Sequence, residues 1–183
     1  MSNTKTKNIL LNVTGSISCY KACNLISLLK KNGYNVEVVA TEDALKFVGK
    51  ATFEGLTKNT LHVDMFNDEY PISHIELAQN FADLIISYPC SANMLNRLSS
   101  GLCDDLFGAI CLANNYNKPL LLAPAMNTQM FLHPSVQNSI KTLTEQGAVI
   151  LPCEKGELAC GDVGYGRLLN PEEVFKIIEK YFV

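Results

Sequence analysis

The chain has 183 residues, of which 48% are hydrophobic and 18% are charged, and its formal net charge is −3. This length and composition suit one domain with a sizeable core and exclude a disordered chain. The acidic balance and the scattered basic residues argue against a nucleic-acid partner or an anionic membrane. No apolar run reaches the roughly 18 residues that span a bilayer, and residues 1–7 are polar. We therefore expect a cytoplasmic protein without a signal peptide.

The sequence contains seven cysteines, an odd number, and no two of them have C-x-x-C spacing. A disulfide framework and a zinc or other metal site are therefore disfavoured. We expect most of these thiols to be buried as small hydrophobic side chains.

Apolar runs and helical patterns alternate along the first half of the chain. Strands are predicted over 9–13, 35–40 and 84–88. Helices are predicted over 16–33, 41–48 and 74–81. Ser16 is the predicted cap of the first helix, which should end near Gly33. The stretch 49–71 predicts no more than a helical turn and a loop.

The alternation continues through the second half. Helices are predicted over 91–100, 104–114 and 134–146, and strands over 119–123 and 148–152. The segment 154–169 is rich in glycine and is predicted to be irregular. Asn170 is the predicted cap of a final helix that has Pro171 at its first position and acidic residues in its first turn.

Strands that alternate with helices indicate an α/β fold. We expect a single domain over 1–183, built as a doubly wound, Rossmann-like or flavodoxin-like parallel sheet with helices on both faces. Ligands of such sheets bind beyond the carboxyl ends of the strands, so the informative residues should follow each strand directly.

Two of the loops that follow strands offer phosphate or ligand contacts. The first is Thr14-Gly15-Ser16-Ile17-Ser18, in which a glycine permits a tight turn before the free amides of a helix. It matches neither the G-x-G-x-x-G nor the P-loop pattern, so a plain strand–helix turn is equally consistent. The second is Pro89-Cys90-Ser91-Ala92-Asn93, whose Ser and Asn are also ordinary helix caps.

Two later loops suggest substrate chemistry. In Ala123-Pro124-Ala125-Met126-Asn127, the Asn127 amide can donate to a carboxylate while it stays neutral, which suits decarboxylation. The alternative is a proline-bounded turn with a core methionine. Three glycines within six residues of the segment 158–167 suggest a flap, in which Cys160 is a candidate proton donor. The alternative there is a solvated turn with a buried cysteine.

His74 begins a predicted helix after a polar loop. A lone histidine is more often structural than catalytic, so both readings stay open. No Ser-His-Asp order and no metal cluster compete for it.

Taken in order, these motifs resemble the flavin-dependent cysteine decarboxylases, and within that family the branch that serves coenzyme A synthesis. The matching pieces are Thr14-Gly15-Ser16-Ile17, His74-Ile75-Glu76-Leu77-Ala78, Ser91-Ala92-Asn93, Gly101-Leu102-Cys103-Asp104, Pro124-Ala125-Met126-Asn127 and Ala159-Cys160-Gly161-Asp162. They keep the family's order and span residues 8–170. The branch that acts on peptides typically has Pro-Asn-Met-Asn at the third loop and lacks the Ala-Cys-Gly-Asp flap.

The resemblance implies a tightly held FMN, a homotrimer with active sites between subunits, and conversion of 4'-phosphopantothenoylcysteine to 4'-phosphopantetheine. The thiol would be oxidised transiently, carbon dioxide lost, and the product reduced again. The implied cofactor contacts are Gly15, Ser16, Ile17, Thr41, Ser91, Ala92, Asn93 and Ala125.

The resemblance also implies the catalytic and substrate-binding residues. His74 would be the catalytic histidine of the flavin half-site, Cys160 would protonate the product enethiolate, and Asn127 would hold the substrate carboxylate. Ala159 and Gly161 would contact the substrate from a flap over 154–169. Arg167 would anchor this flap or bind a substrate phosphate.

Three alternatives remain: a peptidyl-cysteine decarboxylase that releases an enethiol, a non-catalytic regulatory subunit of the same fold, and a generic nucleotide-binding α/β protein. Cys160 argues against the first, because that reaction needs no second reduction. Four residues, Tyr88, Cys90, Met94 and Asp105, depart from those usual in the family. These departures concern flavin contacts and subunit packing.

Overall fold

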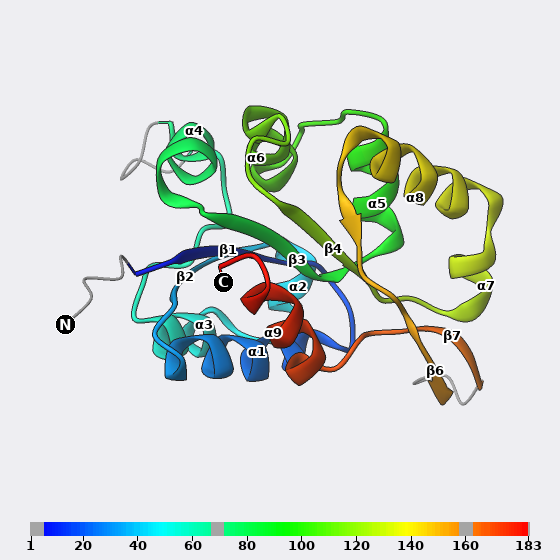
Figure 1. Ribbon diagram of the computed structural model, residues 1–183, viewed down its shortest axis with the longest axis horizontal. Helices are drawn as coiled ribbons and strands as arrows, with labels where there is room; N and C mark the ends of the chain where they lie inside the picture. The colour runs from blue at the N-terminus through cyan, green and yellow to red at the C-terminus, as the bar shows by residue number, and fades with distance from the viewer. Residues whose placement is uncertain (1–5, 67–71, 158–162, 183) are drawn as a thin grey trace.

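The computed structural model describes residues 6–66, 72–157 and 163–182. Five parallel strands form one sheet in the order β2-β1-β3-β4-β5 (Figure 1). The strands are β1 (Asn8–Val13), β2 (Asn35–Ala40), β3 (Leu84–Cys90), β4 (Leu120–Pro124) and β5 (Val149–Ile150). This is the flavodoxin-like order, in which the chain reverses its direction of winding between β1 and β3.

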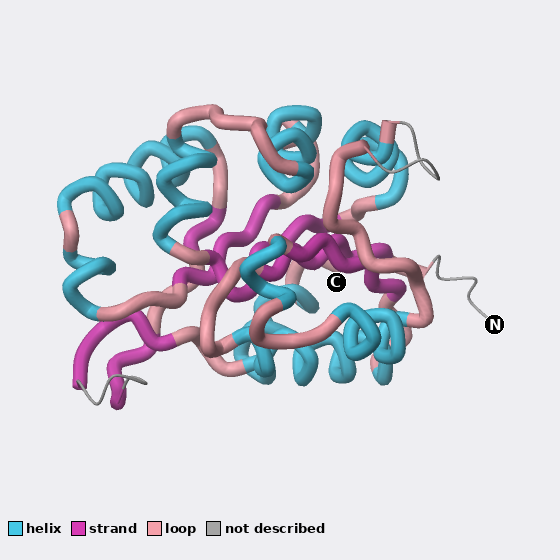
Figure 2. Tube along the Cα trace, turned by 180° about the vertical axis from the view of Figure 1, so that it is seen from behind, coloured by secondary structure: helices cyan, strands magenta, loops and turns pink. Residues whose placement is uncertain are grey.

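Helices cover both faces of the sheet (Figures 1 and 2). One face carries α1 (Cys19–Lys31), α3 (Lys50–Thr57) and α9 (Pro171–Glu179). The other carries α4 (Ser73–Ile75), the π-helix η1 (Glu76–Phe81), α5 (Ala92–Ser99), α6 (Leu106–Asn114) and α8 (Pro134–Gln146). Two short helices, α2 (Glu42–Leu45) and α7 (Thr128–Leu132), follow the carboxyl ends of β2 and β4. The predicted doubly wound α/β fold is confirmed.

The core consists of two layers, one on each face of the sheet. Successive side chains of a strand point to opposite faces, and in β1 Ile9 and Leu11 pack in the layer of α1 and α9, whereas Leu10 packs in the other layer. All three are fully buried. Each such side chain stabilises the fold by roughly 1.5–3 kcal/mol, so the sheet is a rigid platform for the loops at its carboxyl edge.

The start of α1 differs from the sequence prediction. The helix begins at Cys19, and Ser18, not Ser16, occupies the cap position. The Ser16 hydroxyl accepts a hydrogen bond from the Ser18 N–H at 3.2 Å, and the Ser16 carbonyl accepts one from the Cys19 N–H at 3.0 Å. The predicted cap is wrong because residues 16–18 form a turn of their own, in which the serine side chain is used locally.

The glycine-rich segment also differs from its prediction. Instead of irregular chain, it contains the antiparallel strands β6 (Glu154–Glu157) and β7 (Val163–Arg167), which project from one end of the sheet (Figure 1). Residues 158–162, which include the predicted site residues Ala159, Cys160 and Gly161, lie outside the described residues. Among the described residues, no helix has the length and hydrophobicity needed to cross a membrane.

Candidate functional site

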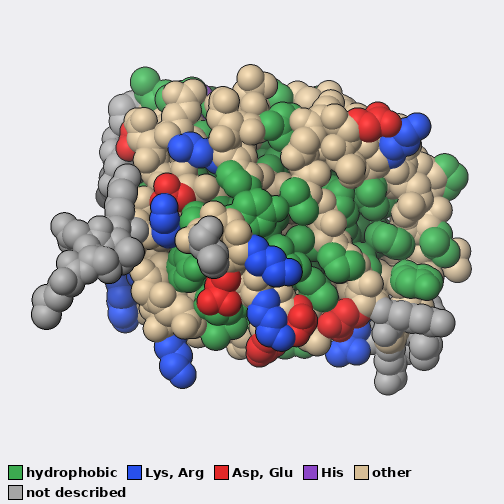
Figure 3. Space-filling view, viewed as in Figure 1, with side chains coloured by type: hydrophobic (Ala, Val, Ile, Leu, Met, Phe, Trp, Pro, Cys, Tyr) green, Lys and Arg blue, Asp and Glu red, His purple; other side chains and the backbone are tan. Residues whose placement is uncertain are grey.

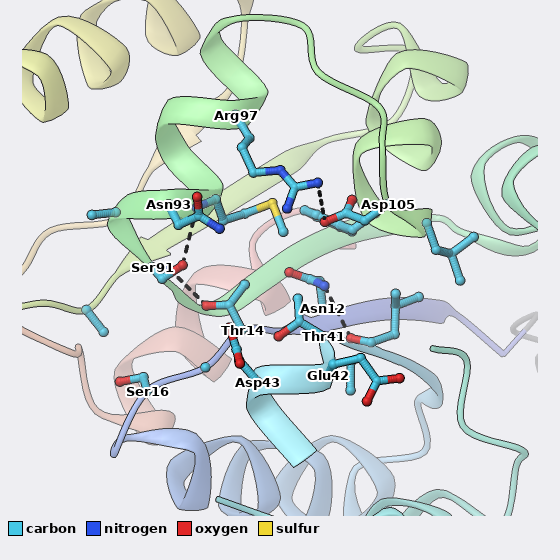
Figure 4. A pocket seen from close by; sticks show the side chains of 18 of the residues that line it. Asn12, Thr14, Ser16, Thr41, Glu42, Asp43, Ser91, Asn93, Arg97 and Asp105 are labelled. Carbon is cyan, nitrogen blue, oxygen red and sulfur yellow. Dashed lines mark hydrogen bonds and ion pairs between the residues drawn. The ribbon is translucent and has the colours of Figure 1, made fainter. Parts of the chain in front are cut away.

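A cavity of about 570 Å³ lies at the carboxyl edge of the sheet, where β1, β2 and β3 end (Figure 4). Its volume is typical of sites for small organic ligands. Seven of the eight predicted cofactor residues line it: Gly15, Ser16, Thr41, Ser91, Ala92, Asn93 and Ala125. The eighth, Ile17, has a side chain that is 62% exposed and is not part of the lining.

Thr14 joins the first two loops beneath this cavity. Its hydroxyl donates to the Pro89 carbonyl at 2.8 Å and accepts from the Ser91 N–H at 2.9 Å. The Ser91 hydroxyl in turn caps α5 by accepting from the Met94 N–H at 3.2 Å. Thr14 is 1% exposed, so water cannot replace these bonds, and the two loops are held in a fixed relation.

Gly15 lies directly against α2. A Cβ atom at this position would lie 2.6 Å from the Cβ of Asp43, closer than two carbon atoms can approach. Thr41 caps α2 by accepting from the Ala44 N–H at 3.2 Å, which fixes the helix at this place. A glycine is therefore required where the first loop passes α2.

Backbone amides in the first two loops form a cluster of hydrogen-bond donors. The N–H groups of Gly15, Ser16 and Ile17 donate to no acceptor within the described part of the chain. The amides of Ala92 and Asn93 begin α5 and have no helical carbonyl one turn before them. Amides at helix N-termini bind phosphate well, since the donors and the helix dipole both favour an anion.

Two polar residues missed by the sequence analysis lie under the centre of the cavity. Asn12 accepts from the Ser87 hydroxyl at 2.8 Å and donates to the Val39 carbonyl at 3.3 Å. Asn12 and Ser87 are fully buried, and Asn12 lines the cavity. An asparagine inside an otherwise apolar strand was the available signal, because a buried polar group needs a structural or functional reason.

A second missed group lies across the cavity from Ser16, as Figure 4 shows. Arg97 of α5 forms an ion pair with Asp104 and places its Nη2 atom 3.2 Å from Oδ2 of Asp105. The other Asp105 oxygen, Oδ1, caps α6 by accepting from the Gly108 N–H at 2.7 Å. Arg97 follows Asn93 by four residues on α5, so helical spacing could have placed it on the same face.

The third loop is fastened to β7. The Met126 N–H donates to the Gly166 carbonyl at 3.0 Å, and the Thr128 hydroxyl donates to the Tyr165 carbonyl at 2.8 Å. Gly166 has a φ of +113°, and a Cβ there would collide with the Met126 carbonyl. The Ala125 N–H donates to the Cys90 carbonyl at 3.0 Å. The β6–β7 ribbon is therefore tied to the rim of the cavity.

Asn127 caps α7. Its Oδ1 accepts from the Gln129 N–H at 2.8 Å, which fixes the orientation of the amide group. The residue lies next to Met126, which lines the cavity, but is itself not in the lining.

Arg167 belongs to a polar chain at the base of the ribbon. Its Nε lies 3.6 Å from Oε2 of Glu154, and Oε1 of Glu154 accepts from the Asn170 amide at 2.8 Å. The Asn170 amide oxygen accepts from Lys21 at 2.9 Å, and Lys21 also donates to the Leu168 carbonyl at 3.1 Å. Burial lowers the pKa of Lys21. Asn170 thus stands before α9 as predicted, but its side chain binds α1 and the ribbon instead of capping.

His74 lies apart from these groups. It is half-buried in α4 and is not among the residues that line the cavity. Figure 1 shows α4 and the β6–β7 ribbon at opposite ends of the molecule. One chain therefore does not bring His74 together with Asn127 and Arg167.

The described thiols are free, and several are strongly shielded. Burial raises the pKa of Cys90 to about 12 and that of Cys153 to about 11. Burial also raises the pKa of Cys111 well above its usual range. Among the six described thiols, two (Cys19 and Cys90) are buried, three are half-buried and Cys103 is exposed, so the expectation that most are buried is wrong. The three shielded thiols stay protonated at neutral pH and are poor nucleophiles.

Comparisons with known proteins agree with this architecture. Residues 1–182 match the family described as Flavoprotein. The chain is 43% identical over 178 residues to the coenzyme A biosynthesis bifunctional protein CoaBC of Bacillus subtilis. The matched region covers 96% of this chain and 43% of that protein. It is also 39% identical over 177 residues to a probable phosphopantothenoylcysteine decarboxylase of Streptococcus mutans. Here the matched region covers 96% of this chain and 98% of that protein. The chain thus spans less than half the length of the bifunctional relative.

Two solved structures share the fold over nearly the whole chain. A PPC decarboxylase mutant complexed with pantothenoylaminoethenethiol has a TM-score of 0.86 at 30% identity, covering 97% of this chain and 99% of that one. The FMN binding protein AtHal3 has a TM-score of 0.81 at 31% identity, covering 97% of both chains.

Proposed function

The chain belongs to the flavoprotein family, and we propose that it is an FMN-dependent phosphopantothenoylcysteine decarboxylase that serves coenzyme A synthesis in the cytoplasm. The observation that carries this proposal is the cavity at the switch point of the sheet. Its lining includes seven of the eight residues that the motif resemblance assigns to the flavin. A relative of nearly the same length bears this enzyme's name, and a solved relative is described as FMN binding.

The residues of the cavity fit FMN at both of its ends. The amide cluster of the first two loops suits the phosphate, and it needs no cationic side chain to do so. Met94, Leu106 and Phe107 line the cavity and offer apolar surface to a flat aromatic ring. When bound, FMN supplies reversible two-electron chemistry, so that the substrate thiol can be oxidised before carbon dioxide leaves and the product reduced afterwards.

Asn127 is assigned the role of binding the substrate carboxylate. Its amide oxygen accepts from the Gln129 N–H, so the substrate carboxylate is assigned to the donating NH₂ end of the amide. A fixed cation would stabilise the carboxylate more than the transition state in which it is lost, whereas a neutral donor orients the group with less of this penalty. The position of Asn127 beside the rim residue Met126 supports the assignment.

The segment 154–169 is assigned the role of a flap over the substrate, with Ala159 and Gly161 in contact with it. Cys160 would donate a proton to the carbon of the enethiolate. For Arg167, the ion pair with Glu154 favours anchoring of the flap over binding of a substrate phosphate. The hydrogen bonds between β7 and the third loop would hold this flap against the rim.

His74 is assigned to the active site of a second copy in a homotrimer, and not to the flavin site of its own chain, because it does not line that cavity. Its distance from the ribbon within one chain supports this arrangement, because the residue can serve catalysis only if another subunit's cavity faces it. Surface side chains at the cavity rim support it further. Met130 and Leu132 of α7 and Tyr165 of β7 are each at least 50% exposed, and Figure 3 shows hydrophobic side chains on the surface over α7.

The visible spectrum of the purified protein tests the cofactor. We expect a yellow protein that releases FMN, and no other flavin, on acid treatment. The His74→Asn variant should retain bound FMN but should no longer oxidise the substrate. A colourless protein that takes up no added FMN would contradict the proposal.

A further inference from the structure

A carboxylate oxygen at the cavity has an unused capacity to accept a hydrogen bond. The Oδ2 atom of Asp105 is shielded from solvent, and it accepts no hydrogen bond from any residue in the described part of the chain. Arg97 lies 3.2 Å away as an ion-pair partner without hydrogen-bond geometry. Arg97 and Asp105 both line the cavity. The ion pair offsets part of the cost of burying this acceptor, and a hydrogen-bond donor from a ligand would offset more of it.

The charge around Arg97 indicates which part of a ligand lies there. The guanidinium faces two carboxylates, those of Asp104 and Asp105, so this corner carries no net positive charge for a phosphate. The amide cluster around Ser16 lies on the other side of the cavity (Figure 4). A ligand whose phosphate binds the amides therefore presents its opposite end to Arg97 and Asp105.

On the premise that the ligand is FMN, we propose that Asp105 recognises the imide edge of the flavin ring. This edge carries one N–H donor with a carbonyl acceptor on each side. Asp105 Oδ2 supplies an acceptor, and the neighbouring Arg97 guanidinium supplies a donor, so the pair matches two adjacent groups of that edge. Both residues would contact the cofactor, and Arg97 also holds the Asp105 carboxylate in position.

The capping role of Asp105 allows a substitution that leaves α6 intact. Serine is as good a helix cap as aspartate, so Asp105→Ser should keep the bond to the Gly108 N–H while it removes Oδ2. Asp104→Asn is the matched control, because Asp104 pairs with the same guanidinium but does not line the cavity. The affinities of each variant for FMN and for FMN methylated at the imide nitrogen are then compared by fluorescence titration.

We expect the wild-type protein to bind FMN roughly ten- to a hundredfold more tightly than the methylated flavin, because methylation removes one hydrogen bond to a charged group. Asp105→Ser should weaken FMN binding by a similar factor and leave the affinity for the methylated flavin unchanged. Asp104→Asn should keep the wild-type preference.

Three other outcomes would overturn the proposal. Equal wild-type affinity for the two flavins would show that Asp105 accepts no hydrogen bond from the flavin imide, and it would leave the proposed function standing. A gain in affinity for the methylated flavin in Asp105→Ser, with FMN binding unchanged, would indicate a steric effect only. Binding of neither flavin by the wild-type protein would instead refute the proposed function, and this inference with it.

Discussion

At the scale of single residues, Gly15 is a position where the cavity tolerates little change. In Gly15→Ala the new methyl group would meet the Cβ of Asp43, so the first loop or α2 must move. We expect FMN affinity to fall by at least about tenfold, because the loop amides leave their places relative to Ser91. Gly55→Ala is the control, since nothing lies within 4 Å of a Cβ there, and it should bind FMN as the wild type does. Unchanged FMN affinity in Gly15→Ala would show that the first loop does not contribute to the FMN site.

The shielded Cys90 thiol predicts a loss of stability in alkali. Its pKa is raised from an ordinary 9.0 to about 12 in the folded protein, so between these values the unfolded chain loses a proton that the folded protein keeps. The free energy of unfolding therefore falls as pH rises above about 9, by up to roughly 1.4 kcal/mol per pH unit for each such group. Tyr88, Cys111 and Cys153 have pKa values raised by burial and add to the fall.

Urea unfolding of the apoprotein at pH 8, 9 and 10 measures this dependence. Cys90→Ala should be less stable at pH 8, because it leaves a small cavity, but its stability should fall less steeply with pH. Cys103→Ala removes an exposed thiol and should follow the wild-type curve. A Cys90→Ala curve parallel to that of the wild type would show that the thiol ionises equally in both states.

Sequence reasoning found the residues of the site that lie in loops or at the start of α5, and it missed Asn12 and Arg97, which lie farther along regular elements. Gly15 and Ser91 stand directly after strands, where ligands of such sheets bind. Arg97 lies in the last turn of α5 and Asn12 near the end of β1, so each reaches the cavity only through the packing of its element. No local pattern could predict the ion pair of Arg97 with Asp105, since helical spacing does not specify how α5 meets α6.

At the scale of elements, the junction between β7 and the third loop controls the proposed flap. Gly166→Ala would place a methyl group against the Met126 carbonyl at a backbone conformation that favours glycine. We expect it to detach β7 from the rim, which lowers turnover of substrate by more than about tenfold while FMN stays bound.

Gly33→Ala is the matched control for this experiment. Gly33 also has a positive φ, but nothing lies within 4 Å of a Cβ at that position. The Gly33→Ala variant carries a similar backbone strain of roughly 1–3 kcal/mol without the collision. Its turnover should therefore remain near that of the wild type. If both variants lost turnover to the same degree, general strain and not the junction would be responsible.

The strands of the main sheet were predictable because they are buried on both faces and read as continuous apolar runs. The β6–β7 ribbon was not, since its glycines indicate turns when the sequence is read locally. Gly164 and Gly166 are instead places where the ribbon packs closely against Thr128 and Met126. This is a tertiary constraint, and the sequence of the ribbon does not carry it.

At the scale of the whole molecule, the separation of His74 from the ribbon predicts that active sites are shared. His74→Asn and Gly15→Asp should each be inactive alone, the first without its catalytic histidine and the second without bound FMN. When the two are unfolded and refolded together, mixed trimers should regain activity, because some sites combine an intact cavity with an intact His74. Light scattering checks the trimer, and mixed trimers without any activity would place His74 in its own subunit's site.

The reaction itself, carried out without oxygen, tests the proposed function most directly. Purified protein with bound FMN is mixed with 4'-phosphopantothenoylcysteine, and carbon dioxide, products and the flavin spectrum are followed together. We expect many turnovers, with one 4'-phosphopantetheine formed for each carbon dioxide and the flavin oxidised at the end, because the electrons taken from the thiol are returned. Absence of carbon dioxide, or one turnover that ends in reduced flavin and a free enethiol, would contradict the proposed function.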